Sequence, residues 1–193
     1  MSTPTQASVW NIANALTALR LLLVPVFWVL LMHQDGADPG WRTAAFAVFA
    51  VAYTDRYDGE LARRRGLVTD LGKIADPIAD KALIGAALIG LSMLAEVGWW
   101  VTVVVLVREV GVTVLRFAVI RYGVIAASRG GKAKTLLQTI AIGLYVLPLS
   151  GVPHAIAAVV MAAAVIVTVV TGVDYVARAA RLRRTSIRAR AAR

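Results

Sequence analysis

The chain has 193 residues, of which 59% are hydrophobic and 17% are charged, and its formal net charge at pH 7 is +10. A soluble domain of this length carries more charge and less apolar surface, so the composition indicates an integral membrane protein with no room for a separate soluble domain. The chain contains no cysteine, which excludes disulfides, thiolate nucleophiles and zinc–thiolate sites.

The first twenty residues are expected to form an N-terminal interfacial helix. Over residues 8–20, apolar side chains recur at helical spacing, and polar side chains such as Thr17 and Arg20 lie off that stripe. No basic segment precedes the apolar stretch, so a cleaved signal peptide is not expected. The interfacial helix leads into a membrane domain over residues 21–176.

Six membrane-spanning helices are predicted in that domain, which is about the number that the bilayer thickness allows. The spans are expected to begin near residues 21, 41, 73, 101, 135 and 155, and to end near residues 32, 65, 95, 121, 149 and 175. The connections between them are short and rich in turn-forming residues, as in the HQDGADPG sequence at 33–40.

Basic residues are unequally divided between the two sides of this predicted domain. One side receives the arginines at 63–65, the basic residues from 121 to 134 and the tail arginines, whereas the other side receives only Arg42. Because positively charged connections stay in the cytoplasm, both termini are expected there. The basic tail at 177–193 is expected to lie on anionic lipid. A specific partner site is the alternative, and nucleic acid is not expected, because no aromatic residues accompany the charge.

Four aspartates form two pairs on the second and third predicted spans: Asp55 with Asp58, and Asp76 with Asp80. The short link between these spans makes the helices antiparallel neighbours, so the four carboxylates are expected to meet in the cytoplasmic half of the membrane. Charges at this depth need compensation, and an oxygen-only ligand set suits Mg²⁺, Mn²⁺ or Ca²⁺. Two such ions would form a clamp for phosphoryl transfer.

The residues around the aspartates suit a phosphate-containing substrate. Gly59, Ala62 and Gly72 have little side-chain bulk, so a ligand can approach the helix backbone. Arg63 follows Gly59 by one helical turn and can offer a forked guanidinium to a pyrophosphate. Two other functions stay open for the aspartates, namely a proton or cation carrier and a purely structural membrane scaffold.

The same stretch resembles the signature of the CDP-alcohol phosphotransferase family, D-x2-D-G-x2-A-R-x8-G-x3-D-x3-D. Every fixed position is met, by Asp55, Asp58, Gly59, Ala62, Arg63, Gly72, Asp76 and Asp80. Most of the chain is similar to the phosphatidylglycerophosphate synthase branch of that family, including NIANALTALR at 11–20 and GKAKTLLQ at 131–138. Two positions depart from the branch: Ala13, where proline is frequent, and Arg56, where an apolar or aromatic residue is usual.

The resemblance implies an all-α integral membrane protein with six transmembrane helices, usually a homodimer, in the bacterial cytoplasmic membrane with its active site facing the cytoplasm. Two divalent cations, Mg²⁺ or Mn²⁺, would be held by Asp55, Asp58, Asp76 and Asp80. Asp80 would also be the catalytic base. The cytidine diphosphate portion of the substrate would face Gly59, Ala62, Arg63 and Gly72.

The implied reaction transfers the phosphatidyl group from CDP-diacylglycerol to sn-glycerol 3-phosphate and releases CMP. Inositol 1-phosphate and phosphatidylglycerol stay open as alternative acceptors. The acceptor's phosphate would be bound by basic residues, for which the candidates are Arg108, Arg116, Lys132 and Lys134, with Arg20 as a further possibility. Arg108 is favoured because an arginine inside a span needs a counter-charge or a ligand, and the adjacent Glu109 is not expected to face it on a helix.

Overall fold

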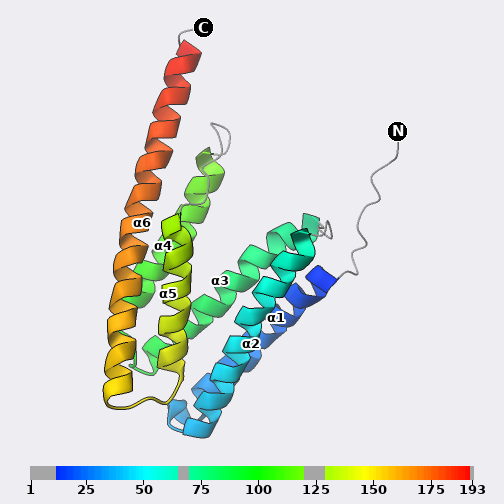
Figure 1. Ribbon diagram of the computed structural model, residues 1–193, viewed down its shortest axis with the longest axis vertical. Helices are drawn as coiled ribbons and strands as arrows, with labels where there is room; N and C mark the ends of the chain where they lie inside the picture. The colour runs from blue at the N-terminus through cyan, green and yellow to red at the C-terminus, as the bar shows by residue number, and fades with distance from the viewer. Residues whose placement is uncertain (1–11, 65–69, 120–128, 192–193) are drawn as a thin grey trace. The chain divides into compact units, whose positions relative to one another are not determined.

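The computed structural model describes residues 12–64, 70–119 and 129–191, with side chains throughout these ranges except at 12–14, 55–64, 70–74, 76–77, 129 and 185–191. Every secondary-structure element in the described ranges is a helix, which confirms the all-α prediction. The elements are α1 (Ile12–Met32), the short 3-10 helix η1 (His33–Gly36), α2 (Pro39–Arg64), α3 (Asp70–Met93), α4 (Trp99–Val119), α5 (Arg129–Val146) and α6 (Val152–Ala191) (Figure 1).

Two of the expected boundaries are not helix ends. α1 runs through residue 20 without a break, so the expected interfacial helix and first span share one helix, with Pro25 inside it. α6 continues past residue 176 as far as Ala191, so most of the basic tail extends the last helix. The tail contains no glycine or proline to end the helix, and its alanines and arginines are strong helix formers.

Two helical stretches of the described residues are long and apolar enough to cross a membrane, Ala15–Gly36 and Val152–Arg184. Many of their apolar side chains are exposed, with Leu22 and Val29 at 67% and 65%, and Val159 at 69%. Exposed apolar surface of this extent indicates contact with lipid or with another protein. The other long helices each carry several charged residues.

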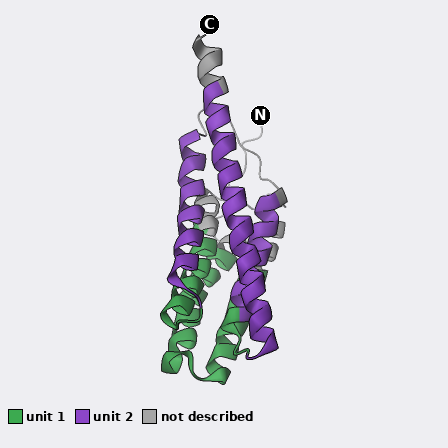
Figure 2. Cartoon of the chain, turned by 90° about the vertical axis from the view of Figure 1, so that its left-hand side faces the viewer, with its two compact units in different colours: residues 1–96, 145–149 green, residues 97–144, 150–193 purple. Residues whose placement is uncertain are grey.

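The chain forms two compact units, coloured separately in Figure 2. Unit 1 comprises Met1–Glu96 and Tyr145–Leu149, and therefore contains α1, η1, α2 and α3. Unit 2 comprises Val97–Leu144 and Ser150–Arg193, and contains α4, α6 and all of α5 except its last two residues.

In unit 1, α1 packs against both α2 and α3. The rings of Phe27 on α1 and Phe49 on α2 are buried, with their centroids 5.8 Å apart. Gly90 on α3 permits a close approach to α1, because a Cβ atom there would lie only 2.7 Å from Leu31 Cδ2. A larger residue at Gly90 would push the two helices apart.

The polar face of α1 is turned toward the protein. Thr17 and Arg20 are buried, at 4% and 2% exposure, whereas Leu19 is 43% exposed. An apolar side chain can face lipid at little cost, but a buried arginine needs hydrogen-bond partners, and those lie inside the bundle. The polar residues that lie off the apolar stripe of the sequence therefore mark the side of α1 that packs.

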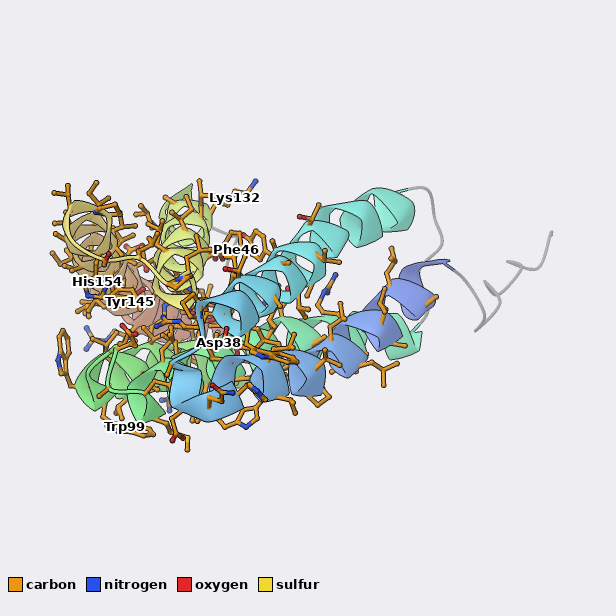
Figure 3. The ribbon with its side chains drawn as sticks, turned by 90° about the horizontal axis from the view of Figure 1, so that it is seen from below. Asp38, Phe46, Trp99, Lys132, Tyr145 and His154 are labelled. Atoms are coloured by element: carbon orange, nitrogen blue, oxygen red, sulfur yellow. The ribbon has the colours of Figure 1, made fainter. Side chains whose placement is uncertain are left out.

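The turn between α1 and α2 is fixed by glycine geometry and by a helix cap. Gly36 has a φ of +69°, and a Cβ atom there would lie 2.7 Å from Leu94 Cδ1. Asp38 Oδ1 accepts hydrogen bonds from the backbone N–H groups of Gly40 and Trp41, so Asp38 (labelled in Figure 3) caps α2 and Pro39 is its first residue.

Arg42 is buried in unit 1. Its guanidinium donates to the backbone carbonyls of Tyr145 and Val146, the last two residues of α5, and pairs with the Glu96 carboxylate. Carbonyls at a helix C-terminus lack partners within their own helix, so the guanidinium satisfies them. The one basic residue assigned to the less basic side of the domain thus has a structural role.

Candidate active site

The signature residues lie on two helices that converge at one end of unit 1, the end at which α1 begins (Figure 1). α2 carries Asp55, Asp58, Gly59, Ala62 and Arg63, and α3 carries Gly72, Asp76 and Asp80. Of these eight residues, the structure describes the side chain of Asp80 alone. The placement of both aspartate pairs on helices, with a short link between them, agrees with the sequence prediction.

Asp80 is held by Arg20 of α1. Arg20 Nη1 lies 3.1 Å from Asp80 Oδ1 and forms an ion pair with it. Arg20 Nε donates to the backbone carbonyl of Ala52 on α2, also at 3.1 Å. The side-chain exposures are 2% for Arg20 and 26% for Asp80, so the arginine is enclosed while the carboxylate keeps access to its surroundings. The sequence predicted Arg20 only as a possible phosphate ligand, so this pairing with Asp80 is a new observation.

The four aspartates fit a divalent-cation site by donor chemistry and by helix placement. All four donors are carboxylates on the converging ends of α2 and α3, and hard cations such as Mg²⁺ and Mn²⁺ prefer such oxygen ligands. Among the described side chains no three acidic or histidine residues gather in one place, and three of the four aspartates lie outside that set. The metal site therefore stays a prediction.

Four of the basic residues proposed for the acceptor phosphate, Arg108, Arg116, Lys132 and Lys134, lie in unit 2. Arg108 on α4 donates from Nη2 to Thr171 Oγ1 on α6 at 3.2 Å, and its Nη1 lies 3.2 Å from Glu109 Oε1. Glu109 was not expected to face Arg108, and this expectation was wrong, because both side chains are long enough to bend along the helix and meet.

Glu109 also pairs with Lys134 of α5. The Lys134 ammonium contacts the same Oε1 atom that Arg108 contacts, and the lysine side chain is only 4% exposed. Lys132 behaves differently, because it is exposed and projects outward from α5 (Figure 3). Arg116 on α4 is exposed as well. Two of the four candidates therefore belong to an ion-pair network, and two present open cationic groups.

A polar stripe on α6 is a feature that the sequence analysis missed. Thr168, Thr171, Gly172 and Tyr175 follow the three-and-four spacing that places residues on one helix face. Thr171 contacts Arg108, and Gly172 lies against its side chain. Within the described part of the chain, Arg108 Nε, Thr168 Oγ1 and the Tyr175 hydroxyl are buried without a hydrogen-bond partner. The sequence signal that could have predicted this stripe is the recurrence of polar residues at helical spacing in an otherwise apolar segment.

Comparison with known proteins gives a consistent result. A family model described as CDP-alcohol phosphatidyltransferase matches residues 10–170. A probable phosphatidylglycerophosphate synthase of Mycobacterium tuberculosis (strain ATCC 25618 / H37Rv) is 61% identical over 177 residues, which cover 91% of this chain and 85% of that protein.

Two more distant relatives carry different names. The CDP-diacylglycerol–glycerol-3-phosphate 3-phosphatidyltransferase of Bacillus subtilis (strain 168) is 36% identical, with 86% of this chain and 93% of that protein covered. A CMP-forming cardiolipin synthase of Streptomyces coelicolor is also 36% identical, but over only 60% of this chain and 54% of that protein. With its complete signature and a match over most of its length, the chain belongs to the CDP-alcohol phosphatidyltransferase family.

Proposed function

We propose that the chain transfers the phosphatidyl group from CDP-diacylglycerol to sn-glycerol 3-phosphate, giving phosphatidylglycerophosphate and CMP. The observation that carries this proposal is the complete eight-position signature on the converging ends of α2 and α3. The acceptor is supported by the relatives named for that product or acceptor, which match 91% and 86% of the chain. The match to a cardiolipin synthase covers only 60% of it.

Asp55, Asp58, Asp76 and Asp80 would hold two divalent cations. When bound, such cations neutralise phosphate charge and orient the reacting groups. The side chains of this chain perform the remaining tasks. The small residues Gly59, Ala62 and Gly72 leave room for the cytidine diphosphate portion, and Arg63 supplies a forked cation to its phosphates.

The bond changes follow from the two substrates. The 1-hydroxyl oxygen of glycerol 3-phosphate attacks the phosphorus that carries the diacylglycerol, a new P–O bond forms, and the P–O bond to CMP breaks. The hydroxyl proton is taken by the Asp80 carboxylate. Arg20 donates to Asp80 Oδ1 and so orients this carboxylate. The catalytic task of the protein is largely positioning and charge stabilisation, as in other phosphoryl transfers.

The acceptor's phosphate dianion needs a cationic site, for which we propose Arg108, Arg116, Lys132 and Lys134. The exposed groups of Arg116 and Lys132 are open to a soluble ligand. Arg108 retains one buried N–H group, on Nε, without a partner in the described part of the chain. Lys134 contributes positive charge, although its ammonium contacts Glu109.

The membrane arrangement that we propose has six spans, formed by α1 to α6, with both termini in the cytoplasm. It is supported by the two strongly apolar helices and by the concentration of basic residues on one side. The active site would then face the cytoplasm, where glycerol 3-phosphate and CMP are soluble. A bacterial cytoplasmic membrane and a homodimer belong to the same proposal.

The deciding experiment measures CMP release from CDP-diacylglycerol by the purified chain in detergent with Mg²⁺ or Mn²⁺. Glycerol 3-phosphate, inositol 1-phosphate and phosphatidylglycerol are offered separately. Release with glycerol 3-phosphate alone, abolished by a chelator, is the expected result. Release with a different acceptor would contradict the acceptor assignment and keep the enzyme class. Ion flux through proteoliposomes, without CMP release, would favour the carrier alternative.

A further inference from the structure

We propose that Arg20 is a positioning residue for the aspartate signature: it sets the place of the Asp80 carboxylate relative to the turn of α2 that precedes Asp55. Arg20 lies outside the signature, on a helix that carries none of its residues. This proposal rests on the proposed function for its kinetic consequence, but not for its consequence on cation binding.

The first support is the burial of a full positive charge. The Arg20 side chain is 2% exposed and is one of the largest fully buried side chains among the described residues. An arginine is rarely buried unless it is paired, because removing its charge from water costs several kcal/mol. The chain tolerates this cost at Arg20, and both described hydrogen bonds of Arg20 lead to the helices of the signature.

The second support is where those two bonds end. Arg20 Nε donates to the carbonyl of Ala52, three residues before Asp55 and therefore one turn away on α2. Arg20 Nη1 donates to Asp80 Oδ1, on the last aspartate of the signature. One planar guanidinium thus links the helix that carries the first aspartate pair to the carboxylate that closes the second pair.

The geometry of the link depends on the fork of the guanidinium. Its N–H groups point in fixed directions from one rigid plane, so the Ala52 carbonyl and Asp80 Oδ1 are held at a defined separation. A lysine keeps the positive charge but presents a single nitrogen on a flexible stem. Arg20→Lys therefore separates the two contributions, because it preserves charge near the aspartates and removes the bridge.

The test compares Arg20→Lys with Arg42→Lys in the full chain in detergent. Arg42 is a matched control: it is also buried in unit 1 and binds backbone carbonyls and a carboxylate, but none of these belongs to the signature. The first readout is the Mn²⁺ concentration that gives half of the metal-dependent rise in unfolding temperature, without substrate. The second readout is the separation of kcat from the KM for CDP-diacylglycerol.

We expect Arg20→Lys to raise the half-saturating Mn²⁺ concentration and to lower kcat by about 10–100-fold, the loss typical of a misplaced reacting group, with little change in KM. Arg42→Lys should lower the unfolding temperature and leave Mn²⁺ half-saturation unchanged. An unchanged Mn²⁺ half-saturation in Arg20→Lys overturns the proposal, whatever its activity. Suppose that the wild-type chain releases no CMP with any of the three acceptors while Arg20→Lys still raises the half-saturating Mn²⁺ concentration. In that outcome the proposed function fails and the positioning role stands.

Discussion

Gly172 on α6 lies directly against the side chain of Arg108 on α4. A Cβ atom at Gly172 would be 3.2 Å from Arg108 Cγ, which is closer than side-chain carbons normally approach. Thr171, the residue before it, accepts a hydrogen bond from Arg108 Nη2. The absence of a side chain at Gly172 and the hydroxyl of Thr171 together determine where Arg108 lies. α6 is therefore the helix that positions Arg108 in unit 2.

Substitution of Gly172 by leucine should weaken the binding of glycerol 3-phosphate. The larger side chain displaces Arg108 and breaks its bond to Thr171. If Arg108 binds the acceptor's phosphate, displacing it removes a charge-assisted hydrogen bond to that phosphate, which costs about 1.5–3 kcal/mol, so the KM for glycerol 3-phosphate should rise about 10–100-fold. The KM for CDP-diacylglycerol should stay near its original value, as steady-state kinetics with each substrate varied in turn will show.

The matched control for that change is Gly111→Leu on α4. A Cβ atom at Gly111 would meet nothing within 4 Å among the described residues, and Gly111 is exposed, so a side chain there starts in open space. Both variants lose a helical glycine, and only one of them acts on Arg108. Equal effects of the two substitutions on the KM for glycerol 3-phosphate would show that Arg108 is not the acceptor's ligand.

Replacing Lys134 by alanine should destabilise the protein far more than replacing Lys132 by alanine. Lys134 is buried against Glu109, so its loss removes one partner of a buried ion pair. Such a loss costs about 3–5 kcal/mol, and we expect the lower end because Arg108 still pairs with Glu109. Lys132 is exposed, so Lys132→Ala should change stability by no more than about 0.5 kcal/mol.

The KM for glycerol 3-phosphate should depend on Lys132 more than on Lys134, the reverse of their order in stability. If Lys132 contacts the acceptor's phosphate, Lys132→Ala should raise the KM for glycerol 3-phosphate while the unfolding temperature in detergent stays constant. Lys134→Ala should lower that temperature. A stable Lys134→Ala protein with a raised KM would assign the phosphate contact to Lys134 and would show that the Glu109 pair opens when the substrate binds.

The sequence predicted the helices and the signature but not the partners of the buried charges. Turn residues and long apolar stretches mark where helices stop and start, so the cap at Asp38 and the hairpin of α2 and α3 follow from local rules. The partner of Arg20 does not, because it depends on which face of α1 packs inward. In a lipid-facing helix the apolar stripe points outward, opposite to the rule for soluble helices.

The ion pair of Arg108 shows a second limit of sequence reasoning. Helical periodicity places side chains by the direction of their Cβ atoms, and adjacent residues then point about 100° apart. Arginine and glutamate have long, flexible side chains that can overcome this difference when a third group, here Lys134, draws the carboxylate to one side. The position of Arg108 inside a predicted span therefore marked it as unusual without identifying its contacts.

Replacing Asp80 by asparagine should abolish turnover. Asparagine keeps the size and one oxygen of the side chain but cannot accept a proton, and loss of a catalytic base costs about 10²–10⁴-fold. Binding of CDP-diacylglycerol should be largely retained, which equilibrium binding of a labelled substrate will measure. The control is Asp174→Asn, an exposed aspartate paired with Arg178 on α6, which should leave kcat unchanged. Full activity of Asp80→Asn would remove Asp80 from the catalytic role.

The absence of cysteine makes the proposed topology directly testable with single cysteines. Ser150 lies in the exposed connection before α6, and Ala180 is exposed near the other end of that helix. Ala180 lies 28 residues beyond Val152, the first residue of α6, and this stretch spans about 42 Å at 1.5 Å per residue, which exceeds the hydrocarbon thickness of about 30 Å. With both termini in the cytoplasm, a membrane-impermeant maleimide should label Ser150→Cys in intact cells and Ala180→Cys only after permeabilisation. The reverse pattern would invert the orientation, and labelling of both from outside would show that α6 does not cross the membrane.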